Sequence, residues 1–432
     1  MSVRYDNLVA ALKTRLGPDV LDPIGRGVAF IRRLRSVTAH KFVWSAVLSR
    51  FHGGRPGFEA ARQCFERLTG KSIQRRAFQV RFKAPSAVHM LERAFAAVIE
   101  PWHASARKLR HPLTRLVRDV VLVDTTVVKV HDDLRKPFPG TGKRNGRDEG
   151  CALLKVVLAT SAFGRVPLYA NLVAGSTHDT RLFPPLETFA KGTLLLFDKG
   201  FYAHRRLQDI AAAGLHFACA VRRRCNPEVL AIHSAPRRAR DAFERGARTL
   251  RDLLPRDAKT RGTWDLDVRI GLMTTRLVVV SGPRHRPLAY YTTLPRERFV
   301  PAAIAELYRV RWQIELVFKE LKQDLNLRSV PTRDEQAAKV FVWASIVALA
   351  VSRCVSQWMH PTVSRFGLES PARPDMISRA MRSAAGFFLS AIARPTLAAL
   401  RLLHEFLAPH LRPTRQRADA LARATHLATA GP

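Results

Sequence analysis

Three acidic residues, Asp124, Asp198 and Glu315, have the type and spacing to act together on phosphate chemistry. Asp124 interrupts the Val-rich run DVVLVDTTVVKV, where an ionised group is costly unless it is paired or holds a metal. Asp198 follows the apolar run LLLF, at the carboxyl end of a predicted strand, which is the edge where α/β sheets bind ligands. If the two strands are neighbours, both aspartates meet there, and Glu315 can join them from a helix.

These three carboxylates provide only oxygen ligands, without His or Cys, and such a set suits Mg²⁺ or Mn²⁺. Two such ions could activate a water or a 3′-hydroxyl and stabilise the leaving oxygen of an in-line phosphodiester displacement. Taken singly, either aspartate is more typical of a hydrogen-bonded turn or cap. The prediction of a metal site therefore depends on all three residues.

The segment from Phe299 to Gln323 must position the third carboxylate, and its pattern predicts one amphipathic helix. At about 100° per residue, a single stripe of this helix carries Tyr308, Arg311, Glu315 and Lys322. The opposite side gathers apolar residues, namely Leu307, Val310, Ile314, Val317, Phe318 and Leu321. Considered alone, the polar stripe is also compatible with a surface helix that carries ordinary charge pairs.

The charge of the chain points to a polyanionic partner. Lys and Arg number 72 against 35 Asp and Glu, which gives a formal net charge of +37 over 432 residues. Basic residues recur along the whole chain, so several faces are expected to contact the partner. Nucleic acid is the favoured partner, and an acidic membrane surface is the rival. A hydrophobic content of 47% excludes wholesale disorder.

Several features predict a cytoplasmic protein that does not enter a membrane. The five cysteines are scattered and never form C-x-x-C, which favours reduced thiols over disulfides or a structural zinc. The longest apolar run, Val340 to Val351, is too short for a span and predicts a buried helix. Residues 1–21 lack an apolar signal region. The GTGK segment at residues 140–143 lacks the spacing of a phosphate-binding loop.

The pattern of residues 1–105 predicts a helical region that binds DNA and is compatible with a helix-turn-helix unit. Gly70 is expected to end one helix and Ser72 to cap the next, with Arg75 and Arg76 presented to DNA. A solvated basic helix is the alternative interpretation of this stretch.

From Asp119 the pattern changes to strands, and their order predicts the fold class. Three strands, the last two joined by a hairpin at Ser161 to Gly164, are followed by helix, strand, helix and strand. The two helices are expected near Thr180 to Phe189 and His204 to Ala213. This order suits an α/β fold with a mixed five-stranded sheet of the ribonuclease-H type.

The remaining segments complete a domain plan. Three short strands between residues 263 and 294 predict a β-rich insertion between the second aspartate and the glutamate helix. The plan has five parts: a helical DNA-binding region (1–105), the first part of the catalytic core (106–222), the insertion (223–295), the second part of the core (296–358) and a helical, basic C-terminal region (359–432).

Four motifs give the chain a resemblance to a known family. They are VDTT around Asp124, GSTHD at Gly175 to Asp179, FDKGFY from Phe197 to Tyr202, and the spacing Tyr308-x2-Arg311-x3-Glu315-x6-Lys322. With these motifs the chain resembles DDE transposases of bacterial insertion sequences, specifically the insertion-sequence-four family. The resemblance covers about Asp119 to Arg353.

The resemblance implies a ribonuclease-H-like core in which Asp124, Asp198 and Glu315 bind two Mg²⁺ or Mn²⁺ ions. It implies cleavage of double-stranded DNA at the element's terminal inverted repeats and transfer of the freed 3′-hydroxyls into target DNA. It also implies a set of DNA contacts, for which we expect Tyr308, Arg311, Lys322, Arg222, Lys319, Trp312 and Tyr290. A homodimer that holds both ends in a synaptic complex, in the cytoplasm and near the nucleoid, is the implied assembly.

The chain departs from some relatives at one step. Those that form a hairpin intermediate carry a Trp on the last insertion strand, whereas this chain has Tyr290 and Tyr291 there. Whether a hairpin forms is therefore left open. His178 and Asp179 belong to a family motif, but we expect them to have a structural role. Two alternatives remain: a DNA-binding regulator or inhibitor without catalysis, and a structure-specific nuclease of the same fold.

Overall fold

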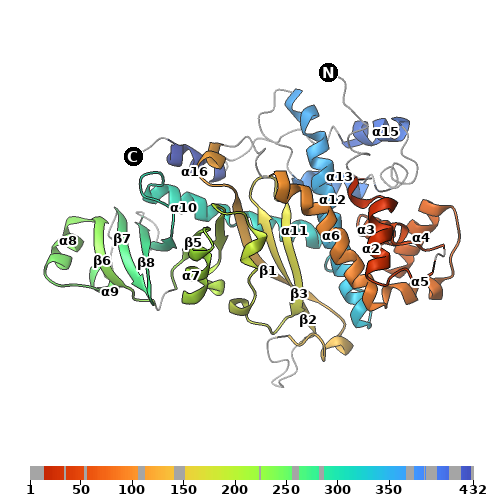
Figure 1. Cartoon of the computed structure of the whole chain (residues 1–432), viewed down its shortest axis with the longest axis horizontal. Helices are drawn as coiled ribbons and strands as arrows, with labels where there is room; N and C mark the ends of the chain where they lie inside the picture. The colour runs from red at the N-terminus through yellow and green to blue at the C-terminus, as the bar shows by residue number, and fades with distance from the viewer. Residues whose placement is uncertain are drawn as a thin grey trace.

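A computed structural model describes residues 14–33, 36–52, 56–105, 112–140, 151–222, 225–254, 262–281, 287–365, 374–383, 385, 397–407 and 420–429. Strands cross the middle of the molecule, with the first helices packed at one end and the strands of the insertion at the other (Figure 1). The GTGK segment falls almost entirely outside the described residues.

The core is a mixed sheet in the order β3-β2-β1-β4-β5. Strand β1 pairs antiparallel with β2 and parallel with β4, while β2 pairs antiparallel with β3 and β4 parallel with β5. The strands are β1 (Val120–Lys129), β2 (Leu153–Ser161), β3 (Pro167–Ala174), β4 (Leu194–Phe197) and β5 (His216–Ala220). The prediction of a ribonuclease-H-type sheet is confirmed, including the β2–β3 hairpin.

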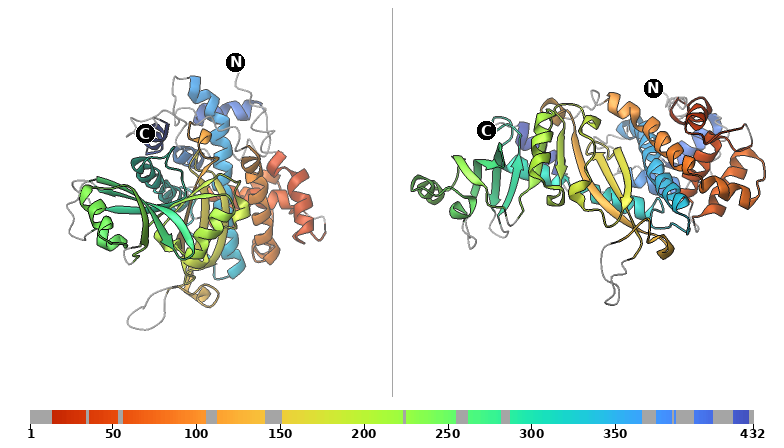
Figure 2. Two further views of the ribbon diagram at one scale, coloured as in Figure 1. Left: turned by 60° about the vertical axis from the view of Figure 1, so that its left-hand side comes forward. Right: turned by 60° about the horizontal axis from the view of Figure 1, so that its bottom comes forward.

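The insertion is not a separate sheet, because its strands extend the core sheet. Strand β9 pairs antiparallel with β5, and the order continues β9-β8-β7-β6, which gives nine strands in all (Figure 2). These strands are β6 (Glu228–Ser234), β7 (Gly262–Ile270), β8 (Met273–Ser281) and β9 (Leu288–Thr292). The three strands expected from the sequence correspond to β7, β8 and β9. Strand β6 was not expected, because its short pattern ends in exposed polar residues.

Helices pack on both faces of the sheet and form both ends of the chain. The α-helices are α2 (Pro18–Gly27), α3 (Ala39–Arg50), α4 (Phe58–Thr69), α5 (Arg75–Phe82), α6 (Pro85–Ser105), α7 (His204–Ala212), α8 (Arg237–Glu244), α9 (Leu250–Leu253), α10 (Pro301–Val310), α11 (Gln313–Gln323), α12 (Glu335–Arg365), α13 (Pro374–Ser383), α15 (Leu397–Leu407) and α16 (Ala420–Thr429). Short 3₁₀ turns are η2 (Pro112–Arg115), η3 (Asp132–Leu134), η4 (Asp179–Arg181), η5 (Leu186–Thr188) and η6 (Lys199–Phe201).

One expected helix in the core is absent from the structure. The stretch from Thr180 to Phe189 was predicted to be helical, but among the described residues it contains only the turns η4 and η5. The consecutive Pro184 and Pro185 explain the difference, since proline lacks an amide donor and restricts the residue before it.

Of the two residues predicted to end α4 and to begin α5, only the first has the predicted role. Gly70 ends α4 with φ of 65°, a left-handed conformation that glycine adopts at little cost. The prediction that Ser72 caps the next helix is wrong, because α5 begins after Gln74. The Ser72 hydroxyl instead donates to Glu66 Oε1 at 2.9 Å, which ties the linker back to α4.

Alternate residues of β1 point into two apolar cores, as the two-residue period of a strand requires. Leu122 packs in the core that contains α6, α11 and α12, whereas Val123 packs in the core that contains α7. Helix α12 is buried as expected, and its stretch Glu335–Ser356 is longer than the predicted apolar run. This stretch is long and apolar enough to cross a membrane, but 94% of its most apolar window is buried inside the fold.

A buried arginine joins the N-terminal helices to the core. Arg50, at the end of α3, is fully buried, and its Nε donates to Ser345 Oγ of α12 at 2.9 Å. Its Nη2 donates to the carbonyl oxygens of Asn326 and Ser329, the latter at 3.1 Å. Asn326 Nδ2 donates back to the Arg50 carbonyl at 2.8 Å. The N-terminal helices therefore have a fixed position against the loop that precedes α12.

Candidate active site

The parallel pairing of β1 and β4 brings the two predicted aspartates to the same edge. The register places Val123 opposite Phe197, so Asp124 and Asp198 are the next residues on neighbouring strands. Asp198 directly follows β4 and caps η6, where Gly200 N donates to Asp198 Oδ2 at 3.3 Å. The structure thus has the neighbouring strands that the sequence argument required.

The segment that carries Glu315 is two helices, not the single helix predicted. Helix α10 ends at Val310 and α11 begins at Gln313, with Arg311 and Trp312 between them. The amides of Arg311 and Trp312 donate to carbonyls three residues earlier, each at 3.1 Å. The two helices have different supports, since α10 packs on the insertion strands β7 and β8 and α11 packs on β1. Arg311 and Trp312 keep right-handed helical dihedral angles, so the junction is a tightened turn between the two helices and not an extended linker.

Arg311 lies between two of the three carboxylates. Its Nη1 is 3.0 Å from Asp124 Oδ2, and its Nη2 is 3.6 Å from Glu315 Oε1. The Arg311 side chain is 18% exposed and that of Glu315 is 49% exposed. Among the described residues, no three His, Cys, Asp or Glu side chains are close enough to hold a metal ion. In this arrangement the Arg311 guanidinium lies between Asp124 and Glu315, and the described carboxylates do not form a cluster of three ligands.

The electrostatics at Asp124 favour an added cation. The pKa of the Asp124 carboxyl is raised to about 6, mainly by burial and to a smaller extent by the nearby carboxylates of Asp198 and Asp179. The Thr125 amide, which donates to Asp124 Oδ1 at 2.8 Å, and the Arg311 guanidinium both oppose this rise in pKa. Crowded, partly buried carboxylates with oxygen donors only are the chemistry that a hard divalent ion fits.

A buried lysine near these carboxylates escaped the sequence analysis. Lys155 on β2 is 9% exposed, and its Nζ lies 2.9 Å from Asp179 Oδ1 and 2.6 Å from the Thr177 carbonyl. Asp179 Oδ1 also accepts from Thr125 Oγ1 at 3.2 Å. A signal for Lys155 was present, because a charged residue interrupts the apolar run CALLKVVLAT just as Asp124 interrupts its own run.

His178 and Asp179, the last two residues of the GSTHD motif, have different surroundings. His178 caps η4, where its Nδ1 accepts from Thr180 N at 3.2 Å. Asp179 faces the turn after β4: an ideal Cβ on Gly200 would lie 3.5 Å from Asp179 Oδ2 and 3.6 Å from Asp198 Oδ2. Asp179 is therefore a fourth carboxylate beside the predicted triad, held by the Lys155 ammonium.

Comparison with known families agrees with this arrangement. Residues 115–351, more than half of the chain, match the family model of the transposase DDE domain. The chain belongs to the transposase DDE domain family. The matched range includes the five core strands, the insertion, and α10 and α11.

Three curated transposases are similar to parts of the chain. It is 27% identical over 219 residues to putative transposase y4zB of Sinorhizobium fredii, covering 50% of this chain and 57% of that protein. It is 39% identical over 57 residues to putative transposase InsL for insertion sequence element IS186A of Escherichia coli, covering 13% and 15%. It is 19% identical over 396 residues to the transposase for insertion sequence element IS1151 of Clostridium perfringens, covering 82% and 81%. The chain thus spans just over half of the first relative and less of the second.

One solved structure shows a more distant similarity. The piggyBac transposase, in a cryo-EM structure of its synaptic complex with hairpin DNA, has a TM-score of 0.46 and 10% identity over 95% of this chain and 86% of that chain. The fold of the DDE domain is defined instead by the strand order given above.

Several residues expected to contact DNA surround the turn after β4 of the DDE domain. The Tyr308 hydroxyl donates to the Phe197 carbonyl at 3.4 Å, and burial raises the pKa of that hydroxyl. Arg222 Nε donates to the Lys199 carbonyl at 2.9 Å, and its guanidinium lies 5.5 Å from the centre of the Tyr202 ring. Both side chains thus support the Asp198 turn in the DNA-free DDE domain.

Tyr290, expected to contact DNA, is buried in this structure. It is 4% exposed, and its ring centre is 4.8 Å from that of Tyr308. Its neighbour Tyr291 is 1% exposed and stacks on Tyr202 at 5.8 Å. Base stacking by either tyrosine would require the DDE domain to open at β9.

The remaining predicted contacts lie on exposed surface. Trp312 is 55% exposed at the junction of α10 and α11, and Lys319 is exposed on α11. Lys322 is half-buried, and its pKa is lowered by burial and by the nearby Arg328. Arg75 and Arg76 are exposed on α5, among the N-terminal helices and outside the part of the chain matched by the DDE domain.

A buried ion pair fixes the Glu315 helix, and the sequence analysis missed it. The guanidinium of Arg353 on α12 donates to both carboxylate oxygens of Glu320 on α11, at 2.8 and 2.7 Å. Both side chains are 1% exposed, and the Ser378 hydroxyl of α13 also donates to Glu320. This pair holds α11 against α12, and therefore holds the helix that carries Glu315.

Proposed function

We propose that this chain is a DNA transposase that cuts at the terminal inverted repeats of an insertion sequence and transfers the freed 3′-hydroxyl ends into target DNA. The observation that carries the proposal is the position of Asp124 and Asp198 side by side on parallel strands, with Glu315 linked to Asp124 through Arg311. Membership of the transposase DDE domain family and the printed names of its relatives support it.

The three carboxylates would hold Mg²⁺ or Mn²⁺, two ions in the full site, and the ions would supply activation of the attacking oxygen and stabilisation of the leaving one. The chain's own residues then have separate tasks. Arg311 and Lys322 bind phosphates near the cleaved end. The Tyr308 hydroxyl, kept protonated by its raised pKa, can donate to a phosphate oxygen. The Lys155–Asp179 pair limits the repulsion around Asp124.

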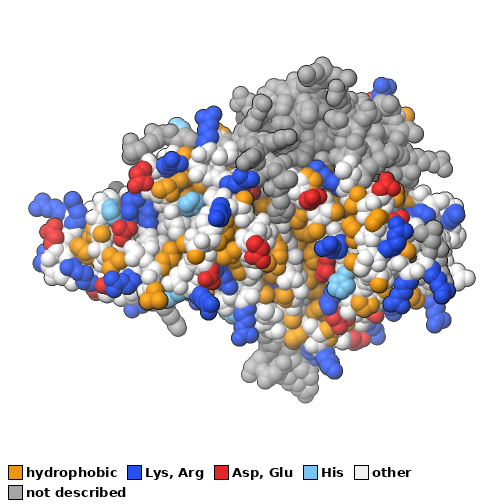
Figure 3. All heavy atoms as spheres, in the orientation of Figure 1, with side chains coloured by type: hydrophobic (Ala, Val, Ile, Leu, Met, Phe, Trp, Pro, Cys, Tyr) orange, Lys and Arg blue, Asp and Glu red, His pale blue; other side chains and the backbone are white. Residues whose placement is uncertain are grey.

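Arginine and lysine side chains are spread over the face shown in Figure 3, from the insertion strands to the N-terminal helices. With a net charge of +37, this distribution supports double-stranded DNA as the partner, with one molecule contacting DNA at several places. We further propose a homodimer that holds both ends, a cytoplasmic protein associated with the nucleoid, and the five-part domain plan given above.

The test is a cleavage and joining assay on duplex DNA that carries the repeats flanking the gene. With Mg²⁺, the wild-type chain is expected to cut at the repeat end and join it to target DNA. Glu315→Gln is expected to lose both products by at least about a hundredfold, because a neutral amide cannot replace an ionic ligand. Glu244→Gln, the same change at an exposed position on α8, is the control and should retain activity.

The products distinguish this proposal from its alternatives. Binding without cleavage by the wild-type chain would indicate a regulator, and cleavage without joined products would indicate a nuclease. Cleavage by Glu315→Gln equal to that of the wild type would remove Glu315 from the site.

A further inference from the structure

An open groove lies between the N-terminal helices and the DDE domain, away from the carboxylates. Its volume is about 650 Å³, and one wall is helix α5 with the side chains of Arg75 and Lys83. The other wall is the segment that leads into α12, with the side chains of Arg333 and Asp334, and His131 beyond the end of β1 completes it. The groove therefore joins two regions that are about 250 residues apart in the sequence.

The groove has a net positive lining. Arg75, Lys83 and Arg333 are all exposed, and all three side chains line the groove. Arg333 has one ion pair, 3.5 Å to the exposed Asp133, and such surface pairs contribute little. The one carboxylate in the lining, Asp334, is engaged, because its Oδ1 accepts from Ala337 N at 2.9 Å as the cap of α12. The lining thus carries three exposed cations against one carboxylate, and the nearby acids Asp133 and Glu59 are themselves exposed.

The two walls are held rigidly, so the groove exists before a partner binds. The ring centre of Phe341 on α12 lies 5.1 Å from the ring centre of Phe58 of α4 and 5.2 Å from that of Phe82 of α5. The buried Arg50 bonds described above connect the same helices to the loop before α12. Preformed positive grooves bind an anionic chain without a large cost of ordering side chains and loops.

We propose that this groove binds the sugar–phosphate backbone of the duplex whose end enters the active site. The proposal rests on the proposed function. An extended polyanion fits better than a small phosphate ligand, because the cations line an open groove from two walls and do not enclose one point. The N-terminal helices, through Arg75 and Lys83, and the DDE domain, through Arg333, would then bind the same duplex.

For a duplex that is taken to run along β1 from the active site, the contact falls at a definite distance from the cleaved bond. His131 is seven residues beyond Asp124, along β1 and its continuation, which corresponds to about 20 Å or slightly more. B-form DNA rises about 3.4 Å per base pair. The groove should therefore contact phosphates about six or seven base pairs from the cleaved bond.

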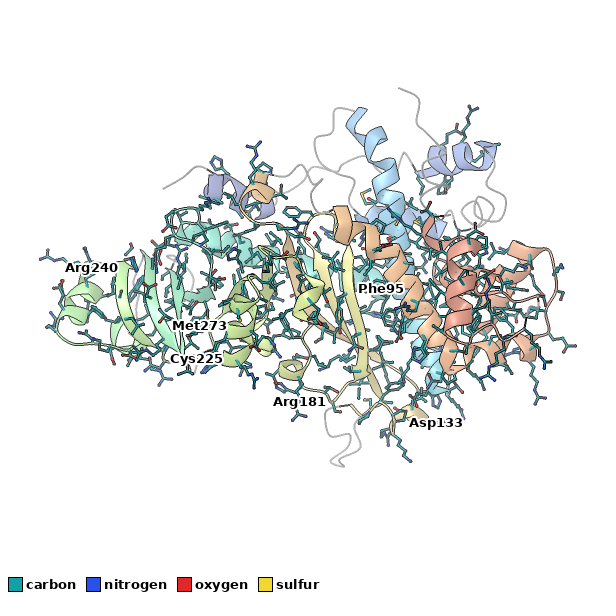
Figure 4. The ribbon with its side chains drawn as sticks, viewed as in Figure 1. Phe95, Asp133, Arg181, Cys225, Arg240 and Met273 are labelled. Carbon is teal, nitrogen blue, oxygen red and sulfur yellow. The ribbon has the colours of Figure 1, made fainter. Side chains whose placement is uncertain are left out.

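The test compares metal-free binding of terminal-repeat duplex by the wild-type chain, by Lys83→Ala/Arg333→Ala, and by the control Arg237→Ala/Arg240→Ala. The control pair is exposed on α8, and Figure 4 shows Arg240 at the far end of the insertion from Asp133 beside the groove. Each lost phosphate contact should reduce the slope of log affinity against log salt by about 0.9. We expect the salt slope of the groove variant to be about two units shallower than that of the wild type. The salt slope of the control should be less than about one unit shallower.

Phosphate ethylation interference provides the second measurement. Ethylation about six or seven base pairs from the cleaved bond should weaken binding by the wild-type chain and the control, but not by the groove variant. An unchanged salt slope in the groove variant, or an equal loss in both variants, would overturn the proposal. So would an interference pattern that the groove variant shares with the wild type. Because binding is measured without metal, these results are independent of whether Glu315→Gln abolishes cleavage.

Discussion

Arg311 Nη1 lies 3.0 Å from Asp124 Oδ2, so an arginine expected to bind DNA contacts a carboxylate expected to bind metal. The same guanidinium reaches Glu315 at 3.6 Å. A divalent ion and Arg311 would thus compete for the same oxygens in the absence of DNA. A phosphate that attracts Arg311 would release both carboxylates together, which would couple DNA binding to completion of the metal site.

The first prediction concerns this competition. Arg311→Ala should bind Mn²⁺ about tenfold more tightly than the wild type when DNA is absent, since a cation about 3–4 Å from a carboxylate opposes a second cation by about 1 kcal/mol or more. Titration calorimetry on the metal-free chains measures this affinity. Arg309→Ala, which removes an exposed arginine paired with Glu306, is the control. Equal or weaker Mn²⁺ binding by Arg311→Ala would contradict the competition.

The second prediction concerns the buried ammonium beside the carboxylates. Lys155→Met keeps the length of the side chain but leaves Asp179 without its ion pair, next to Asp124 and Asp198. The metal-free variant should be less stable by about 1–3 kcal/mol. Added Mn²⁺ should raise its melting temperature more than that of the wild type, because a bound cation would offset the same repulsion. A variant that is destabilised but gains no more from Mn²⁺ than the wild type would show that Lys155 only packs the sheet.

The third prediction tests the anchor of the Glu315 helix. Glu320→Ala removes one partner of a pair in which both side chains are 1% exposed, and leaves the Arg353 guanidinium buried without its counterion. The free energy of unfolding should fall by about 3–5 kcal/mol. Urea denaturation measures this loss, with the exposed Glu244→Ala as the matched control. A loss below about 1 kcal/mol would mean that α11 is held by its apolar face alone.

The fourth prediction concerns pH. Burial raises the pKa of Asp119, at the start of β1, to about 6, although Ser161 Oγ and Val120 N both donate to its Oδ1. A raised pKa in the folded state means that Asp119 stabilises the fold fully below its unfolded pKa of about 4, and loses this contribution as pH rises through about 6. Stability of the wild type should fall over this range by up to about 3 kcal/mol from this group.

Asp119→Asn keeps an acceptor for both hydrogen bonds but cannot ionise. Its stability should therefore change less between pH 4 and pH 7 than that of the wild type, and at pH 7 it should equal or exceed the wild type. Parallel pH profiles for the two chains in urea denaturation would show that Asp119 does not titrate in this range.

The core sheet could be predicted from the sequence because its signals are local. Apolar runs around Asp124 and before Asp198 mark strands, and the order of strands and helices limits the topology to few choices. The family spacing around Glu315 then identifies the third carboxylate. Each of these features can be recognised without knowing which side chains are in contact in the folded chain.

The parts that could not be predicted depend on contacts between distant segments. The break at Arg311 lies between two helices with different supports, α10 on the insertion strands and α11 on β1, although the local pattern is continuously helical. The Lys155–Asp179 and Glu320–Arg353 pairs depend on strand register and on the packing of α11 against α12. The burial of Tyr290 follows from its pairing with β5, which the sequence pattern of β9 does not reveal.

The hydrogen-bonded continuity of β5 with β9 has a consequence for the synthesis of the chain. Ala220 pairs with Tyr290, so the edge of β5 has no partner until about 70 more residues have been made. Glu315 is made later still. The pairing of β5 with β9 must therefore wait for the whole insertion, and contacts over such separations form slowly. A product that stops before β9 would carry the basic N-terminal helices together with a β5 whose second edge is exposed, and exposed strand edges promote aggregation.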